Sequence, residues 1–112
     1  MKTWDDWSDF EINYRIAKRV ITNGNVCIVK NFVTGRKFVY VGVEGEQTEV
    51  DYCNSWSNMG PIIVNNKIGV HPDAFKDGNW FAFDSYDMTM HESAEPLRAA
   101  AIVFLEMNGV NP

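Results

Sequence analysis

The chain has 112 residues, a length typical of one domain that buries its core without metals or disulfides. Apolar residues make up 46% and charged residues 22%, a balance that excludes a disordered chain. The net charge of -5 and the pI near 4.8 argue against duplex nucleic acid as a partner, because proteins that bind a phosphate backbone normally carry a basic patch.

A capping box predicts the first helix. Ser8 is followed three residues later by Glu11, a pattern that satisfies the free amides at a helix start, and we expect the helix to run to about Ile21. Asn13 falls inside the apolar arc of this amphipathic helix. Before the cap, Trp4 and Trp7 are expected to staple the helix to the core; their exposure would instead indicate a protein contact.

Alternating apolar residues predict strands in the middle of the chain. Residues 26–30 form a short strand, and residues 37–43 are apolar on both faces, which predicts an interior strand packed on both sides. The polar residues 45–50 are expected to form a loop. Residues 61–64 and 67–70 flank Asn65 and Asn66, which predicts a hairpin, and residues 79–83 follow an Asp-Gly turn as another strand.

The C-terminal part begins with a polar segment. Residues 86–93 are expected to form a mobile connection, after which Pro96 opens a helix that ends at Gly109. Because this helix is apolar nearly all round, it is expected to be buried. We therefore predict a single α+β domain over residues 1–112, with an antiparallel sheet of four or five strands, an N-terminal amphipathic helix and a buried C-terminal helix.

Motifs for catalysis and metal binding are weak. Cys27 and Cys53 form no C-x-x-C pair, and His71 and His91 lack helical ligand spacing, so no metal site, cofactor or catalytic residue is predicted. Cys53 is expected to be a packed thiol, because nothing nearby in the sequence would lower its pKa. No leader and no apolar run of about 18 residues is present, which indicates a cytosolic protein without a membrane span.

The segment D-Y-C-N-S-W-S-N-M-G-P at residues 51–61 is the best candidate for a ligand site, because it has no helix or strand period. Asp51 and Asn54 offer groups that read a planar polar ligand, and Tyr52 and Trp56 offer rings that stack on a base. Asn13 is expected to point at the same segment. Arg98 or Lys67 would meet a phosphate. The alternative is that Asn13 and Arg98 brace the backbone of the segment, since buried polar groups must be satisfied.

Three segments of the chain resemble the NinX-like family of small lambdoid phage accessory proteins. They are S-D-F-E-I-N from Ser8, the block D-Y-C-N running into P-I-I-V, and P-L-R-A-A followed by I-V-F-L. Members often carry Trp before the Pro-Ile-Ile run, where this chain has Gly60. The resemblance implies an accessory protein of the host cytoplasm, and it brings no catalytic mechanism because the family's function is unknown.

The sequence and the resemblance together favour a non-enzymatic protein that binds a small nucleotide-type ligand. In a phage protein, such binding would sequester a host immune signal, a cyclic nucleotide or an ADP-ribose derivative. The alternative is an inhibitor or adaptor that acts on a host defence protein through an acidic, aromatic surface. An enzyme using Cys53 or a loop carboxylate comes third, and a homo-oligomer with a pocket built from two chains stays open.

Overall fold

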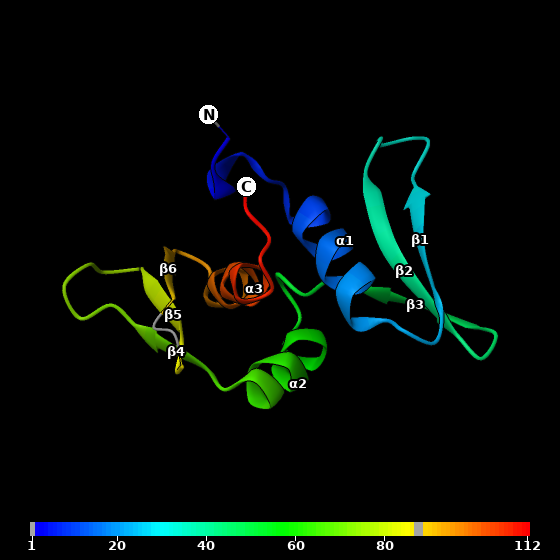
Figure 1. Ribbon diagram of the computed structural model, residues 1–112. Coiled ribbons are helices and arrows are strands. Elements are labelled where there is room, and N and C mark those ends of the chain that lie inside the picture. Colours follow the sequence, from blue (N-terminus) through cyan, green and yellow to red (C-terminus); the bar gives the residue numbers. More distant parts are fainter. Residues whose placement is uncertain (1, 87–88) are drawn as a thin grey trace.

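The computed structural model describes residues 2–86 and 89–112 (Figure 1). A 3-10 turn at Trp4–Asp6 precedes helix α1 (Asp9–Val20), and helices α2 (Trp56–Asn66) and α3 (Pro96–Met107) follow later in the chain. The strands are β1 (Asn25–Lys30), β2 (Lys37–Val43), β3 (Glu46–Val50), β4 (Ile68–Pro72), β5 (Trp80–Asp84) and β6 (Met90–Ser93). The mixed α and β class predicted from the sequence is confirmed.

The strands form two antiparallel sheets. One has the order β1-β2-β3 and the other β4-β5-β6. The prediction of one sheet with four or five strands is therefore wrong in its detail. Residues 45–50, predicted as a loop, pair with β2 because Glu44 and Gly45 both adopt positive φ and make a two-residue hairpin turn.

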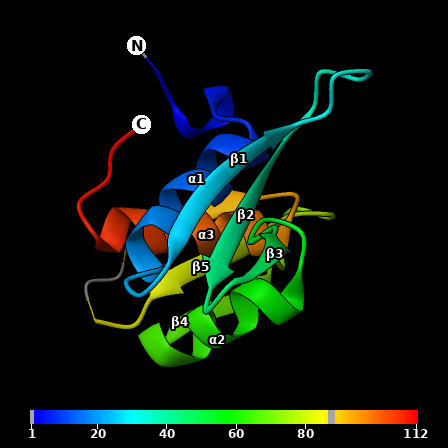
Figure 2. The same cartoon turned by 90° about the vertical axis from the view of Figure 1, so that its right-hand side faces the viewer.

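Helix α3 lies at the centre of the molecule. Its residues Leu97 and 99–105 are all buried, as expected for a helix that is apolar nearly all round. The sheet β4-β5-β6 packs on one side of α3, while α1 lies between α3 and the sheet β1-β2-β3 (Figures 1 and 2). Pro96 occupies the first turn of α3, and Gly109 adopts a φ of 79° just beyond its end, as predicted.

Helix α1 has the predicted cap. The Ser8 hydroxyl accepts a hydrogen bond from the Glu11 backbone amide at 3.1 Å, and the Glu11 carboxylate accepts one from the Ser8 amide at 3.1 Å. The rings of Trp4 and Trp7 are buried with their centroids 4.9 Å apart. Their predicted role as a staple, rather than as an exposed protein contact, is consistent with this burial.

Helix α2 forms where the sequence predicted irregular structure up to residue 61 and a hairpin strand at residues 61–64. The Ser55 hydroxyl caps it by accepting a hydrogen bond from the Asn58 amide, and Met59 and Ile62 are buried on its inner side, where α2 packs against α3. Pro61 lies inside the helix. Packing therefore overrides the strand propensity of the run from Ile62 to Val64.

Two further expectations are corrected. Strand β2 is central in its sheet, but only Val39 and Val41 are buried, so it is not packed on both sides. The predicted connection at residues 86–93 contains strand β6, which pairs with β5, and its residues 87–88 lie outside the described part of the chain. No helix among the described residues is long and apolar enough to cross a membrane.

Candidate functional site

Four polar side chains join the start of α1 to the segment after β3. We call Asp9, Asn13, Asp51 and Asn54 the Asp51 cluster. The Asn13 Nδ2 donates a hydrogen bond to Asp51 Oδ1 at 2.9 Å, and Asn54 Nδ2 donates to both Asp51 oxygens at 3.1 and 3.0 Å. Asn54 Nδ2 also lies 3.1 Å from Asp9 Oδ2. The cluster therefore fixes the loop on the helix.

Asn13 also satisfies the backbone of the loop. Its Oδ1 accepts a hydrogen bond from the Cys53 amide at 3.1 Å, while the Asp51 amide donates to Asn58 Oδ1 at 2.9 Å. Asn13 is buried, which explains why a polar residue stands inside the apolar arc of α1. The predicted meeting of Asn13 with the loop is present in the structure.

Arg98 connects α3 to the same cluster. Its Nη1 lies 2.6 Å from Asp9 Oδ1, and its Nη2 donates to the backbone carbonyls of Trp4 at 2.9 Å and Trp7 at 2.6 Å. The Arg98 side chain is only 15% exposed. Arg98 therefore ties three parts of the chain together, which is the bracing alternative considered for this residue.

Cys53 is buried, as expected for a packed thiol. Burial raises the pKa of the Cys53 thiol far above its ordinary value; the Asp9 carboxylate raises it further, and Arg98 acts in the opposite direction. The nucleophilic thiolate is therefore disfavoured at neutral pH. Among the described residues, no group of three or more His, Cys, Asp and Glu side chains is placed to hold a metal ion.

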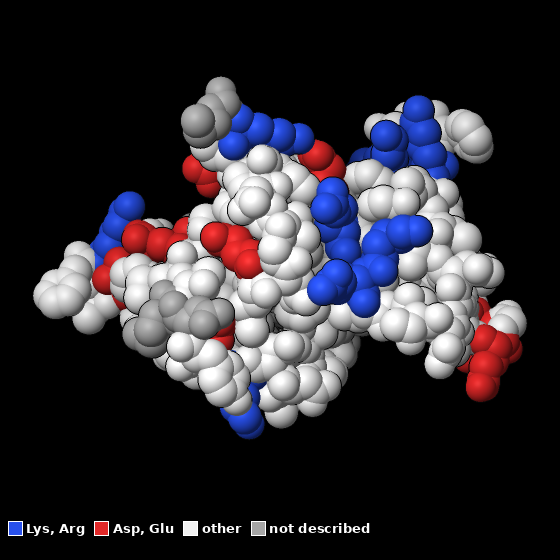
Figure 3. Space-filling view, viewed as in Figure 1, with Lys and Arg blue, Asp and Glu red and all other residues white. Residues whose placement is uncertain are grey.

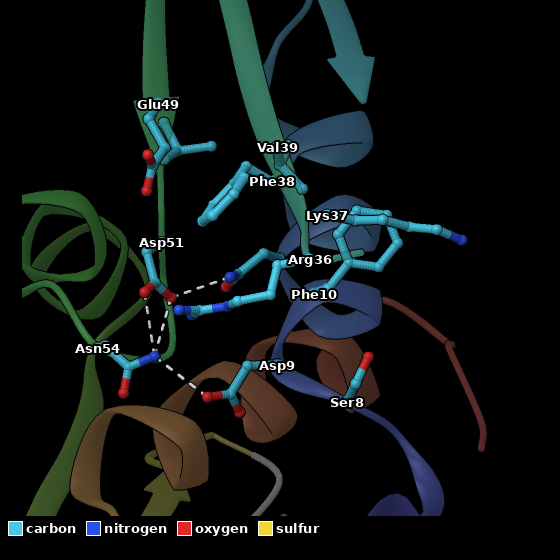
Figure 4. Close-up of a pocket in the computed structure, with 12 residues that line it drawn as sticks. Ser8, Asp9, Phe10, Arg36, Lys37, Phe38, Val39, Glu49, Asp51 and Asn54 are labelled. Atoms are coloured by element: carbon cyan, nitrogen blue, oxygen red, sulfur yellow. Dashed lines mark hydrogen bonds between the residues drawn. The ribbon is translucent and has the colours of Figure 1, made fainter. Parts of the chain in front are cut away.

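A cleft of about 390 Å³ opens beside the Asp51 cluster (Figure 4). We call it the α1–β2 cleft, because the start of α1 and the start of β2 form opposite walls. Its lining residues are Ser8, Asp9, Phe10, Asn13, Arg36, Lys37, Phe38, Val39, Glu49, Val50, Asp51 and Asn54. This volume lies within the ~300–1,000 Å³ typical of small-molecule sites.

Arg36 is the cation best placed to serve the cleft. Its side chain points into the cleft toward Asp51, and the guanidinium carbon lies 5.4 Å from the centroid of the Phe38 ring (Figure 4). The neighbouring Lys37 points away, with its Nζ 5.6 Å from the centroid of the Phe10 ring. Arg36 directly precedes β2 and Lys37 is its first residue, and successive side chains of an extended chain point to opposite sides.

The structure places some predicted ligand residues together and separates others. Asn13, Asp51 and Asn54 line the α1–β2 cleft, whereas Tyr52, Trp56, Lys67 and Arg98 are not among its lining residues. Burial raises the pKa of the Tyr52 hydroxyl, and the Tyr52 ring is enclosed by the core. Trp56 is 59% exposed on the first turn of α2, and Lys67 ends that helix with a left-handed φ of 54°.

The sequence interpretation missed Arg36, Phe38 and Phe10. They lie 13 to 41 positions from Asp51 in the chain, and only the pairing of β2 with β3 brings Arg36 and Phe38 beside it. The pair Arg36–Lys37 was visible as a basic dipeptide at the start of a strand. That pattern alone does not identify which of the two side chains faces a cleft.

Comparison with known proteins identifies one family. The family model described as "Bacteriophage P22, NinX" matches residues 4–108, which is nearly the whole chain and includes every residue that lines the cleft. No curated protein matches the chain.

Proposed function

We propose that this chain, which belongs to the bacteriophage P22 NinX family, is a non-enzymatic binder of a small nucleotide-type ligand. The ligand occupies the α1–β2 cleft, with a phosphate at the Arg36 guanidinium and a base between the Phe38 ring and the Asp51 cluster. The observation that carries the proposal is Arg36, an exposed cation directed into a cleft whose facing wall offers carboxylate and amide groups.

The groups in the cleft suit the two ends of a nucleotide. A guanidinium binds phosphate oxygens through paired N–H donors, and aromatic faces accept stacked bases. The Asp51 carboxylate accepts three hydrogen bonds from Asn13 and Asn54. Since an ionised carboxylate has about four acceptor positions, Asp51 retains capacity for one N–H of a base.

The phage origin of the family supports a role in counter-defence. A protein that binds a nucleotide immune signal without turning it over acts as a sponge, lowering the free concentration of a cyclic nucleotide or an ADP-ribose derivative in the host cytoplasm. The high pKa that burial gives the Cys53 thiol supports binding over hydrolysis. In this proposal Asn13 and Arg98 hold the cleft in shape rather than contact the ligand.

A thermal-shift screen against linear, cyclic and ADP-ribose nucleotides tests the proposal. A ligand at 100 times its dissociation constant stabilises the fold by about 2.7 kcal/mol, which raises the Tm of a domain of this size by about 11 °C. Arg36→Gln should remove the shift, and Lys37→Gln, at the adjacent residue whose ammonium group points away from the cleft (Figure 4), should retain it. A shift that survives Arg36→Gln would refute the assigned cleft.

A second candidate function is an inhibitor or adaptor of a host protein. Phe75 favours it, because this ring is 100% exposed between Asp73 and Asp77 at the tip of the β4–β5 hairpin. The Asp73 carboxylate accepts a hydrogen bond from the Phe75 amide at 2.9 Å, so the tip is ordered. A host protein retained by the native chain and lost with Phe75→Ser would support this role, and a flat nucleotide screen would give it priority.

A further inference from the structure

The charges of this acidic chain are segregated along the sequence. Residues 12–43 contain no Asp or Glu, although the whole chain has 15 acidic and 10 basic residues. The same stretch contains six of the ten cations, namely Arg15, Lys18, Arg19, Lys30, Arg36 and Lys37. Figure 3 shows Lys and Arg gathered over α1 and at the tip of the β1–β2 hairpin, with no acidic side chain between these two groups in that view. The fold therefore has a basic side.

Cations and aromatic rings alternate across this side. Lys30 pairs with Lys37 in the β1–β2 ladder, and Lys37 Nζ lies 5.6 Å from the Phe10 ring centroid. The Phe10 and Tyr14 rings are stacked with centroids 6.4 Å apart. Lys18 follows Tyr14 by one helical turn, so both lie on the same side of α1. We call these five residues the α1–hairpin surface.

Repulsion between the cations of the α1–hairpin surface destabilises the protein when no partner is bound. Lys30 and Lys37 stand directly opposite each other, and like charges in such a pair destabilise a sheet. Within residues 2–86 and 89–112, no carboxylate lies within 4.0 Å of the ammonium groups of Lys18, Lys30 or Lys37. A chain with an excess of acidic residues thus leaves this cross-strand pair of cations without a carboxylate partner. An anionic partner would supply it.

The adjoining hairpin tip exposes apolar side chains in an ordered loop. Phe32 and Val33 are 94% and 95% exposed, and the Asn31 Oδ1 holds the loop by accepting hydrogen bonds from the Val33 and Thr34 amides. The tip projects beyond the body of the molecule (Figure 2), and Lys and Arg side chains gather at it (Figure 3). The exposed Phe32 ring adds a further position for stacking.

We propose that the α1–hairpin surface binds single-stranded nucleic acid, with phosphates at Lys18, Lys30 and Lys37 and bases on the rings between them. Cations beside aromatic faces are the combination that single strands require, because unpaired bases expose the faces that a duplex conceals. A lipid surface fits less well: the exposed Phe32 and Val33 could enter hydrocarbon, but Phe10 and Tyr14, the rings between the cations, are half-buried and could not. This proposal does not depend on the ligand of the α1–β2 cleft.

Fluorescence anisotropy with a labelled oligothymidylate of about 16 nucleotides tests the proposal. Three phosphate contacts predict a slope of about -2 for the logarithm of the binding constant against the logarithm of the salt concentration. Lys30→Glu should weaken binding and reduce the slope by about 1. The matched control is Lys76→Glu, which changes the net charge equally at the opposite hairpin and should leave binding nearly unchanged. An oligouridylate arm distinguishes DNA from RNA as the preferred strand.

Two further measurements separate this surface from a general attraction to anions. Tyr14→Leu retains an apolar side chain but removes the ring, and we expect it to weaken binding about fivefold. Lys30→Glu also removes the repulsion with Lys37, so its thermal unfolding temperature should not fall while its affinity does. Absent binding at low salt, equal binding of polyglutamate, or equal losses with Lys30→Glu and Lys76→Glu would each overturn the proposal. Lys18→Glu should leave nucleotide binding in the α1–β2 cleft unaffected. The cleft proposal and the single-strand proposal can therefore be refuted independently of each other.

Discussion

Arg98→Met should destabilise the fold strongly, although it preserves most of the volume of the side chain. The change removes the contact with Asp9 and two hydrogen bonds to the carbonyls of Trp4 and Trp7. The Trp4 carbonyl retains the Trp7 amide as a donor at 3.1 Å, whereas the Trp7 carbonyl has no other donor among the hydrogen bonds of the described residues. Breaking a largely buried charge pair on one side typically costs about 3–5 kcal/mol.

We expect a loss of about 3 kcal/mol, near the lower limit, because the Asp9 side chain is 37% exposed and can be hydrated once its partner is gone. For a domain of this size, about 3 kcal/mol corresponds to a fall in Tm of about 13 °C. Urea unfolding followed by tryptophan fluorescence measures the free energy of unfolding directly, since Trp4 and Trp7 both lie beside the substituted residue.

The control is Arg19→Met on the exposed side of α1, which removes one hydrogen bond to Asn108 and should cost less than about 1 kcal/mol. A double-mutant cycle with Asp9→Asn should give a coupling energy of about 1–3 kcal/mol. If Arg98→Met and Arg19→Met destabilise the fold equally, Arg98 does not brace the N-terminal segment, and its role as a ligand contact becomes the better interpretation.

Four further predictions concern other parts of the fold. Gly24→Ala should destabilise by about 1–3 kcal/mol, because its Cβ would lie 2.3 Å from a carbonyl oxygen of the neighbouring strand. Gly60→Ala, in open space inside α2, should stabilise by up to about 1 kcal/mol in the same urea experiment. Burial lowers the pKa of His91, so the unfolded chain binds more protons and stability should fall as the pH drops through about 6.5. Urea unfolding of His91→Gln between pH 7 and about 5 should show a smaller fall, and an unchanged fall would contradict the assignment. Burial also raises the pKa of Cys53, so a thiol reagent should modify it much more slowly than the half-buried Cys27; rapid modification would restore the enzymatic alternative.

Local sequence determined the parts of the fold whose signals act within a few residues. The Ser8–Glu11 capping box begins α1, Pro96 begins α3 and Gly109 follows its end, each as predicted. The burial of α3 was also predictable, because a helix that is apolar nearly all round has no side that favours water. These features depend on backbone geometry and on the free energy of transferring apolar side chains.

Helix α2 shows where local signals mislead. Gly60, Pro61 and the β-branched residues after them favour a turn and a strand, yet the helix forms because Met59 and Ile62 are buried in the core on the side that packs against α3. The two residues Glu44 and Gly45 similarly convert a polar segment into strand β3. Tertiary packing and pairing add stability that no short window of the sequence contains.

The candidate site divides in the same way. The sequence by itself identified the segment from Asp51 to Asn54 and its partner Asn13, because a polar residue inside an apolar arc and a loop rich in amides both require hydrogen-bond partners. Only the tertiary structure decided that Arg98 contacts this cluster from α3 and does not line the cleft, while the Arg36 side chain points into the cleft. The direction in which a side chain points depends on strand register and helix packing. Contacts between residues far apart in the chain set both.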